Sequence, residues 1–250
     1  AVKSVTINAT TALTATLAAD YAAASTLTVS GAGKVDLSGA ALSANLTTIN
    51  ASASTGGTSV VLGAAAAKFT GGTGADTVGL GGFVVSEAVD GGAGVDTIVM
   101  QDGSQLTAAT AAKITNFETL RVNDDDDGAS DTFDTSLLSG LTSAVIGAQS
   151  AGDGVVLDKV SSTVASNITI AGNQAVGPQI NVVGASTVGQ QDALTLKFDD
   201  GAAAKNTLTV ANVAAAGVET VNLVTTDNLT LSSATGLTGA TTLDTLGLAD

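Results

Sequence analysis

The stretch Gly71-Gly72-Thr73-Gly74-Ala75-Asp76-Thr77-Val78-Gly79 decides the fold, because it returns as Gly91-Gly92-Ala93-Gly94-Val95-Asp96-Thr97-Ile98-Val99. Both copies fit the pattern G-G-x-G-x-D-x-U-x, where U is apolar, which is the repeat of a parallel β-roll. Each copy joins a glycine turn to a minimal strand. Because side chains alternate between the two faces of a strand, we expect Val78 and Ile98 to point into the core.

The spacing of the two copies predicts how they stack. A coil of such a roll takes two repeats, roughly 18 residues, and brings every second turn to the same edge about 4.8 Å above the last. Gly71 and Gly91 stand 20 residues apart, which corresponds to one coil with a short insertion. Residues 80–88 between them keep a Gly-Gly pair but carry Ser86 in place of the aspartate. We therefore expect no complete site at the opposite edge.

The two turns carry groups that suit a hard divalent cation. Glycine lets the chain turn tightly and aim backbone carbonyls inward, and one aspartate per copy adds negative charge. Calcium takes about six to eight oxygen ligands and needs no nitrogen or sulfur. The pattern therefore predicts bound calcium (Ca2+). The alternative is a pair of glycine-rich turns in a β-protein without a metal.

The composition favours a fold of thin, stacked layers. The chain has 250 residues, of which 44% are apolar but only 2% aromatic, and a core of small aliphatic side chains suits a solenoid. Short runs rich in Thr, Val and Ile recur between turn residues from end to end. We predict an all-β fold: a parallel β-solenoid with a β-roll at about residues 71–99, further short-strand solenoid lobes, and few short helices. The clearest helix is expected at 106–114, and a short turn at 64–68.

Charge and residue usage exclude several classes of function. The net charge is −15, and the eight basic residues are scattered singly without interleaved aromatic residues, so we expect no nucleic-acid partner. No apolar run is long enough to suggest membrane insertion. The absence of His and Cys excludes Ser-His and Cys-His catalysis, disulfides and thiolate zinc sites. With Tyr21 as the sole tyrosine, we predict that the chain is not an enzyme.

A longer repeat suggests two lobes. The segment Ile114-Thr115-Asn116-Phe117-Glu118-Thr119-Leu120-Arg121-Val122 resembles Ala215-Ala216-Gly217-Val218-Glu219-Thr220-Val221-Asn222-Leu223, and an acidic turn follows each. We predict one solenoid lobe over residues 1–123, which contains the roll, and a second strand-rich lobe over 124–250, with no flexible linker between them.

These features together resemble a known family. The glycine-aspartate roll, the two Glu-Thr-hydrophobic segments and the acidic, Cys-free composition are similar to those of RTX-type (haemolysin-type calcium-binding repeat) surface-layer, or S-layer, proteins of Caulobacter-like bacteria, over roughly residues 60–225. The resemblance implies type I secretion, an extracellular location on the cell surface, calcium-dependent folding and self-assembly into a two-dimensional lattice. It also implies contact with cell-surface polysaccharide through parts outside this chain. The runner-up is a module of a large secreted RTX adhesin or other RTX exoprotein.

The resemblance also implies a ligand set. In RTX rolls the ion lies between two stacked turns, and the oxygens come from backbone carbonyls and the two aspartates. On this sequence the implied ligands are Gly71, Thr73, Asp76, Gly92, Gly94 and Asp96. The chain starts directly in strand-like sequence without a recognisable signal peptide, so we expect it to be a segment of a longer protein.

Other acidic residues are weaker candidates for a metal. The run Asp124-Asp125-Asp126-Asp127-Gly128 is the densest negative charge in the chain, and crowded carboxylates repel one another unless a cation lies between them. We name Asp124 and Asp126, together with Asp90, as candidate ligands. The alternative for the run is a solvated acidic loop. Asp153-Gly154 and Asp199-Asp200-Gly201 are first of all turn signals.

Overall fold

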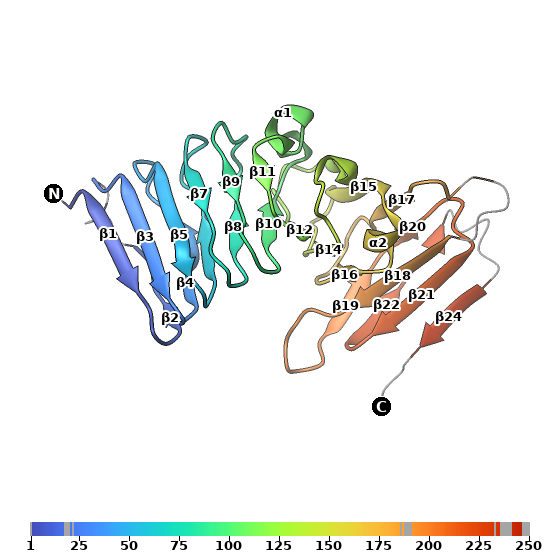
Figure 1. Cartoon of the computed structure of the whole chain (residues 1–250). Helices are drawn as coiled ribbons and strands as arrows, with labels where there is room; N and C mark the ends of the chain where they lie inside the picture. Colours follow the sequence, from blue (N-terminus) through green and yellow to red (C-terminus); the bar gives the residue numbers. More distant parts are fainter. Residues whose placement is uncertain are drawn as a thin grey trace. The chain divides into compact units, whose positions relative to one another are not determined.

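The fold is that of a computed structural model of the chain (Figure 1). It describes residues 2–17, 21, 23–185, 187 and 192–232, and the backbone of 234–235 and 242–246. The chain is all-β, and its parallel strands wind into a β-solenoid, as the sequence predicts. It divides into two compact units, residues 1–120 with 137–140, and residues 121–136 with 141–250.

The first unit is built from two parallel sheets, which the chain visits in turn. In each sheet the strands follow one another in chain order, so every strand pairs with its counterpart one coil later. One sheet has the order β1 (Ser4–Asn8), β3 (Thr26–Gly31), β5 (Thr48–Ser54), β7 (Lys68–Thr70), β9 (Val89–Asp90), β11 (Ile114–Thr115). Within this unit the other sheet has the order β2 (Leu13–Thr14), β4 (Val35–Ala41), β6 (Thr58–Val61), β8 (Thr77–Gly79), β10 (Thr97–Met100), and then the first two residues of β12 (Thr119–Val122).

Parallel register places like residues above one another in the core. Leu27, Ile49, Phe69 and Val89 are partners along one sheet, and all four are buried. On the other sheet Val60, Val78 and Ile98 are partners and are buried as well. The predicted inward direction of Val78 and Ile98 is therefore confirmed. Each such side chain contributes about 1.5–3 kcal/mol when it leaves water.

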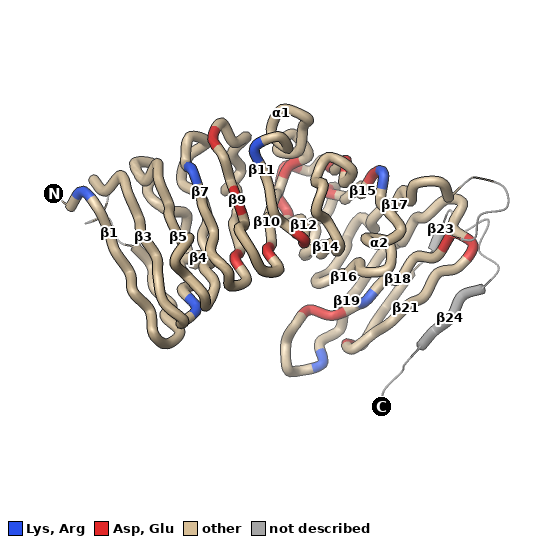
Figure 2. Tube along the Cα trace, viewed as in Figure 1, with Lys and Arg blue, Asp and Glu red and all other residues tan. Residues whose placement is uncertain are grey.

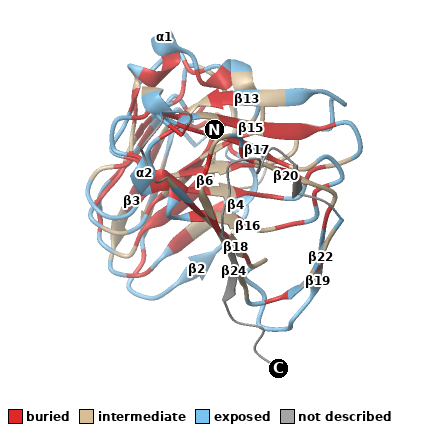
Figure 3. Ribbon diagram, turned by 90° about the vertical axis from the view of Figure 1, so that its right-hand side faces the viewer, coloured by how far each residue is buried: buried red, intermediate tan, exposed pale blue. Residues whose placement is uncertain are grey.

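The second unit repeats this arrangement with different turns. Within this unit, one series of parallel neighbours has the order β14 (Ser143–Ile146), β16 (Ile168–Ile170), β18 (Ala193–Phe198), β21 (Thr220–Thr225), β24 (Thr242–Leu246). Another has the order β13 (Ser130–Asp134), β15 (Gly154–Val160), β17 (Gln179–Val182), β20 (Val213–Ala214), β23 (Ala234–Thr235), and a third pairs β19 (Thr207–Val210) with β22 (Asn228–Leu231). Figure 3 shows buried residues along strands such as β15 and exposed residues in the connecting loops.

Helices are few and short in the described part of the chain. They are α1 (Ala108–Ala111), α2 (Ser162–Ala165) and the 3-10 turns η2 (Gly103–Gln105) and η3 (Thr135–Leu137). The helix predicted at 106–114 is therefore only one turn long. Thr107 caps its start by accepting a hydrogen bond from the Thr110 amide, and Ile114 already pairs with Val89 in the sheet. Strand pairing here outweighs the helix propensity of alanine. None of the described helices has the length and apolar character of a membrane span.

Candidate functional site

The two glycine-aspartate turns stack at one edge of the first unit. Asp76 stands directly before β8 and Asp96 directly before β10, and these strands pair with Thr77 opposite Thr97. The two aspartates therefore occupy the same position in successive coils. Both side chains are buried, with 1% and 0% of their surface exposed. Such burial is uncommon for aspartate and requires compensating contacts.

Backbone amides supply most of those contacts. Asp76 accepts hydrogen bonds from the Thr58 amide at Oδ1 (2.6 Å) and from the Gly72 amide at Oδ2 (2.8 Å). Asp96 accepts one at Oδ1 from the Asp76 amide (2.6 Å). In the next coil Glu118 Oε2 accepts from the Asp96 amide (2.8 Å). Each carboxylate thus binds the amide at its own position in the coil before, and we call Asp76, Asp96 and Glu118 the acidic column.

The acidic column unites two patterns that look separate in the sequence. Its members precede Thr77-Val78, Thr97-Ile98 and Thr119-Leu120, so each is an acid followed by Thr and an apolar residue. The bonds span 18, 20 and 22 residues, which shows that the coils differ in length. In the second unit Glu219 Oε2 accepts from the Asp192 amide in the same way, 27 residues away. The shared acid-Thr-apolar signal was available in the sequence, whereas the common role follows from the register.

One oxygen of the acidic column has no hydrogen-bond partner. Of the four carboxylate oxygens of Asp76 and Asp96, only Oδ2 of Asp96 lacks one, and it is fully buried. The pKa of Asp96 is raised to about 6, mainly by burial; the hydrogen bond from the Asp76 amide lowers it, and the nearby charges of Asp76, Glu118 and Asp90 raise it. Burial likewise raises the pKa of Asp76. A cation beside Asp96 Oδ2 would remove this electrostatic cost.

Stacking by itself explains most of the glycines. A Cβ on Gly71 would lie 1.8 Å from the Gly91 carbonyl oxygen, and a Cβ on Gly91 would lie 2.0 Å from that of Asn116. At Gly71 and Gly91 the next coil therefore lies too close for a side chain. The two copies nevertheless differ in backbone conformation. Gly92 and Gly94 have φ of 93° and 140°, whereas the corresponding glycines of the first copy stay outside the left-handed region.

The residues whose carbonyls are predicted to bind the ion lie in two turns that are hydrogen-bonded to each other. The Gly72 carbonyl accepts from the Ala93 amide (2.8 Å), which ties the turns together. Thr73 is exposed, and its amide donates to the Ser54 carbonyl (3.0 Å). Metal ligation by the carbonyls of Gly71, Thr73, Gly92 and Gly94 stays a prediction.

Asp90 lies beside the second turn. Its Oδ1 accepts from the Gly92 amide (3.1 Å) and from Asn116 Nδ2 (2.7 Å). Its charge is one of those that raise the pKa of Asp96. Asp90 therefore adds negative potential to the roll turns, and its role as a ligand stays a prediction.

The structure assembles two further groups of carboxylates in the second unit. Within the described residues, two sets of three acidic side chains have oxygens within 4.8 Å of one another, Asp124-Asp125-Asp153 and Asp199-Asp200-Asp227. Neither set includes a member of the acidic column. Of the candidates in the acidic run, Asp124 belongs to a set, whereas Asp126 is exposed with φ of 62° and lies outside both.

The sequence pointed only weakly to Asp153, and it did not point to Asp227 at all. Asp153 and Asp227 are buried and stand directly before β15 and β22, as Asp76 and Asp96 stand before β8 and β10. An aspartate before a short strand is thus the common signal. Figure 2 shows the wider charge pattern, in which basic residues are isolated and acidic residues gather in turns and loops.

Comparison of the chain with protein-family models, curated proteins and solved structures found no match.

Proposed function

We propose that this chain is a structural component of a calcium-dependent, self-assembling bacterial surface layer, in which calcium in the roll turns staples successive coils. One observation carries the proposal: two copies of a calcium-type turn stack directly, and the buried Asp96 Oδ2 of the second turn has no hydrogen-bond partner. The resemblance of the sequence to RTX surface-layer proteins supports the cellular role.

Electrostatics explains why a cation would be needed there. At neutral pH an ionised Asp96 lies among the negative charges of Asp76, Glu118 and Asp90, and a buried charge without a partner is strongly unfavourable. Calcium accepts irregular sets of carboxylate and carbonyl oxygens, whereas magnesium demands a tight octahedron and gives up its water reluctantly. The glycine turns therefore suit calcium better than magnesium.

The charge of the whole chain fits the proposed assembly. A net charge of −15 keeps copies apart until cations screen or bridge them. A solenoid also offers long, regular surfaces on which copies of the chain can associate. Calcium would thus act on folding, inside the roll, and on assembly, between copies.

Electron microscopy of the purified chain with calcium, with magnesium at matched ionic strength and with chelator tests the proposal. We expect ordered sheets with calcium only, and we expect Asp96→Asn to weaken both the fold of residues 71–99 and the sheets. Calcium-stabilised monomers that never form sheets would instead assign the chain to a secreted RTX adhesin or other exoprotein. Equal sheet formation with magnesium would show general charge screening and reject the calcium site.

A further inference from the structure

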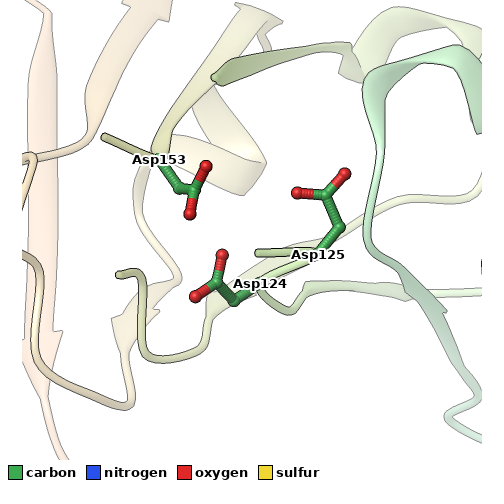
Figure 4. Close-up of side chains that lie close together, drawn as sticks. All are labelled: Asp124, Asp125 and Asp153. Atoms are coloured by element: carbon green, nitrogen blue, oxygen red, sulfur yellow. The ribbon is translucent and has the colours of Figure 1, made fainter. Parts of the chain in front are cut away.

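Three carboxylates of the second unit converge on one point. Asp124 and Asp125 lie in the acidic run before β13, and Asp153 ends the turn before β15 (Figure 4). In Figure 4 the Asp153 carboxylate faces those of Asp124 and Asp125. Their nearest oxygens lie within 4.8 Å of one another, a separation that one cation can bridge.

The solenoid register creates this group. Strands β13 and β15 are parallel neighbours, with Ser130 opposite Gly154, so the turns that precede them are stacked. Ser150 joins the two turns, because its amide donates to Asp124 Oδ2 (2.9 Å) and its hydroxyl donates to Asp153 Oδ2. The three carboxylates therefore lie within a single compact unit, and Ser150 links two of them.

A second observation points to a ligand. Asp153 is 2% exposed, yet its Oδ1 has no hydrogen-bond partner. Buried polar atoms are normally paired, so an unpartnered carboxylate oxygen beside two further carboxylates calls for an explanation, and a bound cation supplies one. Hydrogen bonds within the turn account for Oδ2 and leave Oδ1 unexplained.

We propose that Asp124, Asp125 and Asp153 bind a calcium ion that staples the turn before β13 to the turn before β15. This site lies outside the glycine-aspartate roll and goes beyond the proposed function, since it requires neither the roll site nor assembly. Three carboxylates offer the hard oxygen ligands that calcium prefers, and backbone carbonyls and water complete the coordination. The chain has no His or Cys to favour a softer metal.

The other carboxylate set does not support a similar proposal. Both oxygens of Asp227 accept backbone amides, from Asp200 (2.8 Å) and Asn206 (3.3 Å), and Asp199 forms an ion pair with Lys197. Partners within the protein therefore account for the carboxylates of Asp199 and Asp227, whereas Asp153 Oδ1 has no hydrogen-bond partner.

Calcium binding to the full chain tests the site. Equilibrium dialysis and calorimetric titration would count the ions bound by the parent, Asp153→Asn, Asp96→Asn and the matched control Asp126→Asn. Asp126 lies in the same acidic run but outside the group, and asparagine tolerates its left-handed backbone. We expect Asp153→Asn to bind one calcium fewer than the parent and Asp126→Asn to bind the same number.

Each outcome separates this site from the roll site. Loss of one ion in Asp153→Asn but none in Asp96→Asn would support this proposal and reject calcium in the roll. The converse would overturn this proposal and leave the roll site intact. Circular dichroism checks that each variant folds. If Asp153→Asn does not fold, the double variant Asp124→Asn with Asp125→Asn decides, and an unchanged calcium count in it overturns the proposal.

Discussion

The acidic column of the first unit and the group of Asp124, Asp125 and Asp153 in the second unit differ in how the protein compensates their negative charges. In the column, backbone amides satisfy most of the carboxylate oxygens of Asp76 and Asp96. In the group, Asp124 and Asp153 face each other across stacked turns, and Ser150 bridges them. The column is a stacking device that also offers one open oxygen, whereas the group gathers negative charge at one point.

The pKa shifts of the two regions differ in sign for a physical reason. Burial dominates at Asp96 and raises its pKa. At Asp153 the hydrogen bond from the Ser150 hydroxyl has the largest effect and lowers the pKa. Burial alone therefore does not decide how an aspartate titrates, because the number and quality of its donors compete with desolvation.

We expect the largest effect from adding a side chain where turns stack most closely, and the two regions differ in how closely their turns stack. Gly71→Ala would place a methyl group 1.8 Å from a backbone carbonyl, whereas at Gly152 the nearest contact of an added Cβ is 3.1 Å. We expect Gly71→Ala to destabilise the protein by about 3 kcal/mol or more, and Gly152→Ala by about 1 kcal/mol through its left-handed backbone. Thermal unfolding measures both.

Gly39→Ala is the matched control for that comparison, since its Cβ would meet only the Thr16 hydroxyl at 3.5 Å. It should leave the melting temperature within a degree or two of the parent, on the order of 0.5 kcal/mol. Equal losses for Gly71→Ala and Gly39→Ala would contradict close stacking of the roll turns.

Calcium removal is expected to have the next largest effect. With roughly 2 mM calcium and a Kd of about 0.1 mM, one site in the folded state contributes roughly 1.8 kcal/mol. Chelator should therefore lower the melting temperature and speed amide exchange in residues 71–99, and magnesium should not restore either. An unchanged melting temperature in chelator would contradict the proposed calcium site in the roll.

Acidification in chelator should then move the two regions in opposite directions. The pKa of Asp96 is raised from 3.8 to about 6, so its folded form holds a proton more readily than the unfolded chain. Stability from this group is complete below 3.8 and is lost as the pH rises through about 6. Lowering the pH from 7 to 5 should thus stabilise the first unit by about 1 kcal/mol.

The second unit should respond with the other sign. The lowered pKa values of Asp153 and Asp134 contribute stability above the unfolded value, and that stability is lost as the pH falls. Amide exchange, read separately for the two units, measures both trends. Asp96→Asn should abolish the gain in the first unit. If the gain persists in that variant, another group is responsible.

Replacement of the two exposed aspartates of the acidic run, Asp126 and Asp127, is expected to have the smallest effect on folding. Asp126 and Asp127 are exposed, so replacing both with Asn should change stability by no more than about 0.5 kcal/mol. If this loop lies at a lattice contact, the loss of repulsion or calcium bridging should still change sheet formation. Melting temperature and electron microscopy in calcium check the two expectations. Unchanged sheets would favour a solvated loop.

Much of the fold could be read from the sequence because it is periodic. The alternation around Val78 and Ile98, the glycine turns and the spacing of the two copies predicted parallel coils that stack turn on turn, and the register of β8 with β10 confirms this. The prediction of a helix over 106–114 is too long because Ile114 pairs with Val89 in the sheet. Local helix propensity does not include such tertiary pairing.

The candidate sites also differ in whether the sequence or only the tertiary structure reveals them. The sequence by itself determined the roll turns, since the glycines and the aspartate of each turn lie within one short repeat. Only the tertiary structure decided that Asp153 meets Asp124, that Glu118 joins the column of Asp76 and Asp96, and that Asp96 Oδ2 lacks a partner. The coils range from 18 to 27 residues along these bonds, so residues that stack have no constant spacing. Parallel strand pairing sets their register, while turns of variable length absorb the difference at the surface.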